Sequence, residues 1–196
     1  MLEEVDSFEY LGSVVAANGG VEADVGSRVA EASKAMGALR RVLKNRGMSL
    51  AAKRGLYEGV IVPTVLYGAE AWSTRVAERK KLNVFEMKCL RSMIGVTRMD
   101  RLRNETVRQR VGITTELSER VDARVLRWFG HMERMPEERL VKKIVNADVE
   151  GRRARGRPRM GWMEAVKRAL SERGLTMEDG RERARDRAEW RMIVNG

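Results

Sequence analysis

The chain has 196 residues, of which 39 are Lys or Arg and 28 are Asp or Glu, and its formal net charge is +11. This length allows one large domain or two small ones, each with a hydrophobic core. The excess of basic residues makes a polyanion the first partner to consider. Residues 1–100 carry 15 basic and 12 acidic side chains, whereas residues 101–196 carry 24 and 16, so we expect the second half to dominate the electrostatics.

Cysteine usage and hydropathy exclude several classes of protein. Cys89 is the only cysteine, which excludes an internal disulfide and a cysteine-ligated zinc site and is typical of a reducing compartment. The longest apolar stretch, residues 59–66, contains Pro63 and is far shorter than the ~20 residues that a membrane span needs. We therefore expect a soluble, intracellular protein of the nucleus or the cytoplasm that has no membrane partner.

The N-terminal segment is the one place where a strand or hairpin is expected. Phe8, Tyr10, Val14 and Val15 favour extended backbone, and the turn-forming residues 18–20 follow them. Beyond this point the pattern becomes helical.

Apolar residues recur at steps of three and four over residues 21–43, which predicts a long helix that packs one face. Residues 50–68 are apolar on most sides, so they should form a buried helix, kinked at Pro63. Further helices are expected over residues 76–94 and near residues 104–111.

A charged amphipathic helix should follow. An apolar stripe runs along this helix and consists of Leu117, Val121, Val125, Trp128 and Met132. Beside it runs a basic strip, which consists of Arg120, Arg124, Arg127, His131 and Arg134. The strip is typical of a nucleic-acid contact and equally of a solvated helix face, in which Glu116 pairs with Arg120. His131 could support the fold through a hydrogen bond or touch a phosphate.

The C-terminal part alternates helices with an arginine-rich break. A short helix over residues 137–147 precedes the break, and two helices that close near Gly174 and near the C-terminus follow it. The sum is a mainly α protein of seven or eight helices in two packed subdomains, with one short N-terminal strand or hairpin. The expected segments are residues 1–20, 21–112, 113–150, 151–160 and 161–196.

No catalytic or metal-binding constellation is expected. His131 is the only histidine, Cys89 faces the predicted core, and no glycine-rich phosphate loop occurs. Glu178, Glu182 and Asp186 share a helical spacing, but arginines alternate with them, which is typical of a solvated, salt-bridged face. The four tryptophans occupy apolar helical positions and are expected to anchor the core, with stacking on exposed bases as the alternative.

The sharpest polar feature is an arginine-rich arm of residues 152–159. It contains Arg152, Arg153, Arg155, Arg157, Pro158 and Arg159. Residues 155–158 repeat the Arg-Gly-Arg-Pro core of the AT-hook, an arm that binds the narrow minor groove of A/T-rich DNA. The alternative is a soluble linker, but planar and always charged guanidinium groups at this density favour contacts with phosphate.

Six short motifs occur along nearly the whole chain. They are Phe8-Glu9-Tyr10-Leu11-Gly12, Leu66-Tyr67-Gly68-Ala69-Glu70-Ala71-Trp72, Phe85-Glu86-Met87 with Cys89-Leu90-Arg91, Asp100-Arg101 with Asn104-Glu105, Leu126-Arg127-Trp128-Phe129-Gly130-His131, and Arg155-Gly156-Arg157-Pro158-Arg159 with Trp162. In this order they resemble the C-terminal part of the reverse transcriptase of non-LTR (LINE-like) retrotransposons. Ala69, Ala71 and Val125 depart from the residues that are common in that family.

The resemblance implies a thumb-like, nucleic-acid-binding region that follows the Tyr-x-Asp-Asp box of such polymerases. No Asp-Asp pair occurs in the chain, so the region would hold template and primer without catalytic aspartates and without a cofactor, whereas the parent polymerase would use Mg²⁺. Its partners would be RNA, DNA or an RNA–DNA hybrid, together with the palm and fingers of that parent. Tyr10, Leu11 and Gly12 would help to position the primer end.

Two other classes of function stay open. One is a stand-alone AT-hook-like module, which would prefer A/T-rich duplex DNA. The other is a helical interaction protein or an inert remnant of a truncated element, with no affinity for nucleic acid beyond that of any protein of this charge.

Overall fold

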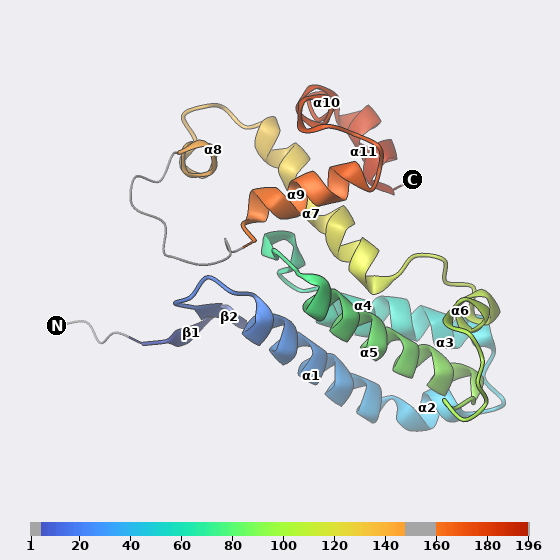
Figure 1. The fold of residues 1–196 in the computed structure, drawn as a ribbon. Coiled ribbons are helices and arrows are strands. Elements are labelled where there is room, and N and C mark those ends of the chain that lie inside the picture. The colour runs from blue at the N-terminus through green and yellow to red at the C-terminus, as the bar shows by residue number, and fades with distance from the viewer. Residues whose placement is uncertain (1–4, 148–159, 196) are drawn as a thin grey trace. The chain divides into compact units, whose positions relative to one another are not determined.

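The computed structural model describes residues 5–147 and 160–195 (Figure 1). It confirms the mainly α class with a short N-terminal hairpin. The described residues fall into two compact units: the first contains the residues up to Gly68 and Thr74–Arg120, and the second contains Ala69–Ser73 and the chain from Val121 onward. None of the helices in this part of the chain is long and apolar enough to cross a membrane.

The hairpin consists of strands β1 (Ser7–Tyr10) and β2 (Ser13–Ala16), which pair antiparallel with Phe8 opposite Val15. Leu11 and Gly12 connect them with φ angles of 48° and 79°. Positive φ at both positions is typical of the two-residue turn that matches the twist of paired strands. This backbone suits Gly12 and is unusual for a side chain such as Leu11.

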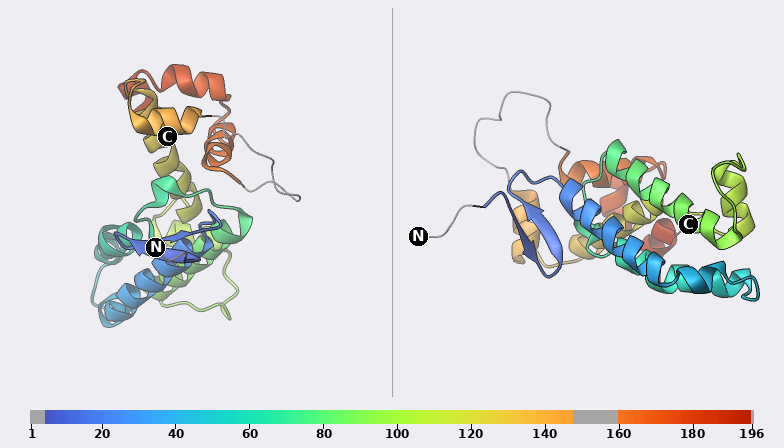
Figure 2. Two further views of the ribbon diagram at one scale, coloured as in Figure 1. Left: turned by 90° about the vertical axis from the view of Figure 1, so that its left-hand side faces the viewer. Right: turned by 90° about the horizontal axis from the view of Figure 1, so that it is seen from below.

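The first unit is a helical bundle built around one long helix. It contains α1 (Glu22–Ala38), α2 (Arg40–Lys44), α3 (Leu50–Leu56), the π turn η1 (Tyr57–Ile61), α4 (Val62–Val65), α5 (Val76–Ile94) and α6 (Asn104–Val111). Helix α5 contacts α1, α2, α3 and α6, and Figure 2 shows α1 and α5 side by side. Fully buried residues such as Leu43, Ile61, Leu82 and Leu90 form the core. Cys89 is buried among them, as expected.

The irregularity expected at Pro63 takes the form of the π turn η1. The amide of Val62 donates to the carbonyl of Tyr57, five residues earlier. Proline lacks an amide hydrogen and its ring crowds the preceding turn of a helix, so a wider turn at this point relieves the clash. The expected helix over residues 50–68 is therefore divided into α3, η1 and α4.

Helix α7 (Leu117–Glu133) begins in the first unit and continues into the second, which also contains the 3₁₀ turn η2 (Ala69–Ala71), α8 (Leu140–Asn146), α9 (Trp162–Ser171), α10 (Met177–Arg183) and α11 (Arg187–Asn195). Trp190 lies in the core of this unit, where its Nε1 donates to the carbonyl of Leu126 at 2.9 Å. A Cβ atom on Gly130 would lie 2.0 Å from the same Nε1. Glycine is therefore required where the indole crosses α7.

Helix ends follow the expected signals. The Ser49 hydroxyl accepts from the amide of Ala52 at the start of α3, and Thr176 caps α10 in a reciprocal box with Asp179. Trp72 and Trp190 are buried, and Trp128 and Trp162 are partly buried. These positions agree with anchoring of the core.

Candidate nucleic-acid interface

The basic strip expected on α7 is largely engaged in contacts inside the protein. Arg120 binds Glu58 with both terminal nitrogens, one of them at 2.8 Å, and these hydrogen bonds raise the pKa of its guanidinium. Glu116 does not pair with Arg120, because its carboxylate lies 2.7 Å from Arg108. Arg108 also binds the buried carboxylate of Glu86 at 2.8 Å.

The rest of the strip lies in the second unit. Arg124 approaches Glu70 at 3.8 Å, and Arg134 donates to the carbonyl of Ala184. Burial lowers the pKa of Arg134. Arg127 is exposed and donates to the side chain of Asn195, and exposed His131 lies beside the Trp128 ring. Arg127 is therefore the arginine of the strip that presents its charge most openly.

The predicted primer-end residues lie at the tip of the hairpin. Tyr10 and Leu11 are 62% and 73% exposed. The carbonyl of Gly12 accepts from Arg28 of α1, whose guanidinium lies over the ring of Tyr67. The other predicted set, Arg152, Arg153, Arg155, Arg157, Pro158 and Arg159, lies outside the described residues.

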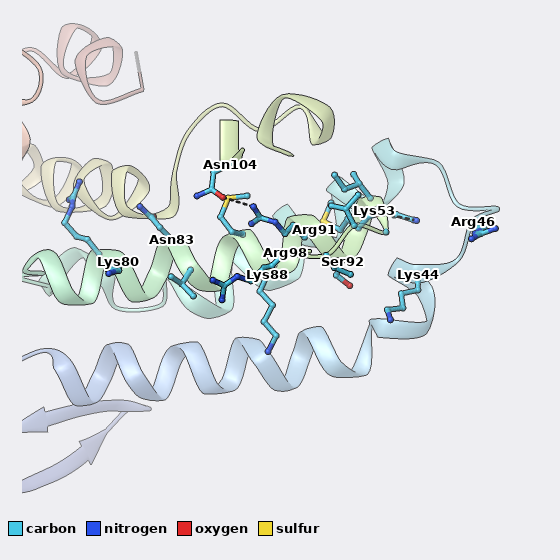
Figure 3. A pocket seen from close by; sticks show the side chains of 18 of the residues that line it. Lys44, Arg46, Lys53, Lys80, Asn83, Lys88, Arg91, Ser92, Arg98 and Asn104 are labelled. Atoms are coloured by element: carbon cyan, nitrogen blue, oxygen red, sulfur yellow. Dashed lines mark hydrogen bonds between the residues drawn. The ribbon is translucent and has the colours of Figure 1, made fainter. Parts of the chain in front are cut away.

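A large groove among the described residues follows α5. Its volume is about 1460 Å³. It is bounded by the end of α2, by α5 and by the segment that follows α5 (Figure 3). Its charged lining is entirely basic and consists of Lys44, Arg46, Lys53, Arg79, Lys80, Lys88, Arg91 and Arg98. We call it the α5 groove.

Helical spacing places three cations of α5 on one side. Lys80, Lys88 and Arg91 are separated by eight and three residues, so they share a face of the helix. Val84 lies between them on the same face and is exposed. A smaller groove of about 430 Å³ between α5 and α1 is also lined by Lys80, Lys81 and Lys88. The lysines of α5 therefore form a ridge with a hollow on either side.

Seven of these eight cations divide into a fixed floor and a free rim, and the eighth, Arg79, donates to the carbonyl of Ser118. Lys53 donates to the carbonyl of Met93 at 3.2 Å, and Arg91 donates to the carbonyl of Leu102 and the side chain of Asn104. The rim consists of Lys44, Arg46, Lys80, Lys88 and Arg98, all exposed and none in an ion pair with a described residue. These five cations are available for an anionic partner.

The acids of α5 do not offset this charge, because they face the other way. Glu78 is 5% exposed and caps the start of α5 by accepting from the amide of Arg75. Glu86 is fully buried against Arg108, and its burial raises its pKa. A count of charges along the sequence includes both acids and does not show which side chains are exposed, so it does not reveal this basic surface. The helical spacing of Lys80, Lys88 and Arg91 was the signal that could have revealed it.

The chemistry available in the α5 groove is the binding of anions. Helix α5 has 19 residues, so the groove follows a path of about 28 Å. Lysine and arginine side chains spread along such a path match the spaced phosphates of a nucleic-acid backbone. Among the described residues no group of three or more His, Cys, Asp or Glu side chains is placed to hold a metal ion.

Comparisons with known proteins give one informative likeness. The chain is 23% identical over 203 residues to an uncharacterized transposon-derived protein of Caenorhabditis elegans, and the match covers 98% of this chain and 71% of that protein. The chain resembles a transposon product. No protein-family model matches it, and no solved structure does. The likeness points to a transposon origin.

Proposed function

We propose that the chain is the nucleic-acid-binding, C-terminal part of a non-LTR retrotransposon reverse transcriptase and holds template and primer without catalytic aspartates of its own. The observation that carries the proposal is the α5 groove, in which five exposed cations line a path with no acidic side chain. The order of the sequence motifs and the likeness to a transposon-derived protein support it.

Each part of the chain has a role in this proposal. The rim of the α5 groove holds phosphates of a duplex, and Tyr10, Leu11 and Gly12 at the hairpin tip lie near the primer end. The arginines of residues 152–159 add electrostatic affinity. The palm and fingers of the parent polymerase supply the Mg²⁺-dependent chemistry, so this chain alone incorporates no nucleotides.

The salt dependence of binding tests the α5 groove. Each phosphate contact on duplex DNA contributes about 0.9 to the slope of log affinity against log salt concentration. Changing Lys80, Lys88 and Arg98 together to Ala should therefore flatten the slope by about 2.7. The matched control removes three exposed arginines from the second unit, namely Arg185, Arg187 and Arg191. Both variants lose the same net charge.

The comparison of the two triple variants decides the outcome. A flatter slope for the groove variant alone supports the proposal, whereas equal changes in both variants would mean that binding follows net charge. Nucleotide incorporation by the purified chain on a primed template would contradict the proposal directly.

The arginine arm is tested separately. If its five arginines all contact phosphate, they contribute a slope of roughly −4 to −5 on duplex DNA, which the five Ala substitutions would remove. Competition between A/T-rich duplex DNA and an RNA–DNA hybrid separates the stand-alone AT-hook module from the polymerase fragment. The module prefers the A/T-rich duplex, whereas the fragment shows little sequence preference.

A further inference from the structure

The turn between α5 and α6 (Figure 1) carries one strongly exposed apolar side chain and several exposed arginines. Met99 is 88% exposed, the highest value among the exposed large hydrophobic residues of the described chain. Arg98, Arg101 and Arg103 are exposed on the same turn. A single exposed methionine needs no explanation on an ordinary surface, but this one shares its turn with three exposed arginines.

The turn is held in shape by its own hydrogen bonds. The amide and hydroxyl of Thr97 donate to the Asp100 carboxylate at 2.6 and 2.8 Å, and the amide of Met99 donates to the Thr97 hydroxyl at 3.2 Å. The bonds to Thr97 lower the pKa of Asp100, so its charge is directed into the turn. Arg101 adopts a φ of 52°, and its amide donates to the carbonyl of Arg98.

The same turn forms one end of the α5 groove. Val96, Thr97 and Arg98 line the groove together with Asn104, and Arg91 of α5 binds both Leu102 and Asn104. Figure 3 shows Arg98 among the lining side chains. A duplex whose phosphates follow the groove therefore meets the turn where the path ends.

We propose that Met99 acts as a wedge that inserts between adjacent base pairs of a bound duplex, while Arg98 and Arg101 hold the phosphates on either side. This inference rests on the proposed function, because it needs a duplex in the α5 groove. Proteins that bend nucleic acid insert apolar side chains such as Met or Leu into a base step and flank them with basic residues. Met99 is preorganised for that role, since its turn is fixed before the partner binds.

Fluorescence of 2-aminopurine tests the wedge. The base analogue is placed at successive positions of a DNA duplex and of an RNA–DNA hybrid, and each is titrated with the full chain. We expect the fluorescence to rise at one position when the duplex binds, because the analogue brightens when it is unstacked. Met99→Ala should abolish the rise and weaken binding by about tenfold, because the apolar side chain is no longer buried between base pairs. The slope against salt should stay unchanged, because no charge is removed.

The controls separate the wedge from the proposed function. Met192→Ala removes another exposed methionine, on α11, and should keep the fluorescence rise, as should Met99→Leu. Tight, salt-dependent binding with no rise, or with an equal rise in Met99→Ala, would overturn the wedge and leave the proposed function standing. Failure of the chain to bind any duplex would overturn both. If the fluorescence rises only with the DNA duplex or only with the RNA–DNA hybrid, that result identifies the duplex that Met99 enters.

Discussion

The guanidinium of Arg28 lies 4.4 Å from the centre of the Tyr67 ring and donates to the carbonyl of Gly12. This one side chain joins two motifs that are more than fifty residues apart, because Gly12 ends the first motif and Tyr67 is the second residue of the other. Arg28 also donates to the hydroxyl of Ser13 and pairs with Asp24 at 3.9 Å. The hairpin tip is therefore positioned by a buried cation on α1.

Removing this cation should destabilise the first unit. Arg28 is buried, so Arg28→Ala leaves the Gly12 carbonyl and the Asp24 carboxylate with fewer partners. We expect the free energy of unfolding to fall by about 2–4 kcal/mol, measured by urea denaturation. Tyr67→Phe is the control, since it keeps the ring under the guanidinium and should change little. A loss below ~0.5 kcal/mol in Arg28→Ala would show that the contacts of Arg28 do not stabilise the first unit.

Gly130 should tolerate no side chain. A methyl group there overlaps the indole of Trp190, so Gly130→Ala should lower the free energy of unfolding by about 1–3 kcal/mol through overpacking. Gly55→Ala is the matched control, because Gly55 also lies in a helix and has no atom within 4 Å of its added Cβ. That variant should gain about 0.5–1 kcal/mol. Equal effects at the two glycines would contradict the tight crossing at Trp190.

Replacing Arg120 should lower stability without changing binding, whereas replacing Arg127 should leave stability unchanged. Arg120 is held by Glu58, so Arg120→Ala should cost about 1–2 kcal/mol of stability, a value that allows for the partial exposure of the pair. The salt slope for duplex binding should stay within experimental error. Arg127→Ala should leave thermal unfolding unchanged, since Arg127 is exposed. A clear drop of the salt slope in Arg120→Ala would instead place that residue on nucleic acid.

The buried thiol of Cys89 should be inert and should make stability depend on alkaline pH. Burial raises the pKa of Cys89 from 9.0 to about 12, and burial also raises the pKa of Tyr57. A group with a raised folded-state pKa stabilises the protein below its unfolded pKa and loses that contribution as pH rises toward the folded value. Stability should therefore fall between pH 9.0 and about 12.

Thiol labelling provides the direct readout for Cys89. A disulfide reagent at pH 8 should modify the native chain only at the rate of its unfolding and should react fully in denaturant. Rapid labelling of the native chain would contradict the burial of this thiol.

Local patterns in the sequence predict much of the fold. The steps of three and four in apolar residues predict α1, α5 and α7, and Ser49 and Thr176 mark helix starts that the structure confirms. The sequence predicts less well where an expected helix is divided into shorter ones. Pro63 signals an irregularity, but a π turn rather than a kink depends on how the neighbouring helices pack around residues 57–61. More helices result than the seven or eight expected, because three expected helices are each divided.

The candidate site was harder to predict, because it depends on contacts that are distant in sequence. Helical spacing offers Glu116 as a partner for Arg120, yet the partner in the structure is Glu58, 62 residues away. Glu86 looks like a surface acid, yet it is buried against Arg108 from another helix. Charge counted by segment cannot separate buried from exposed groups, so it missed the α5 groove.

Helix α5 holds its acids inward and its lysines outward, and this ties the surface of the first unit to its interior. Inserting one residue before Glu86 would turn the rest of the helix by about 100°. Such a rotation would move the Glu86 carboxylate away from Arg108 to the buried position of Met87, and it would carry Lys88 to the buried position of Cys89. An insertion or deletion within α5 would therefore disrupt the interior of the first unit. The surface of this helix can change only by substitution of its exposed residues.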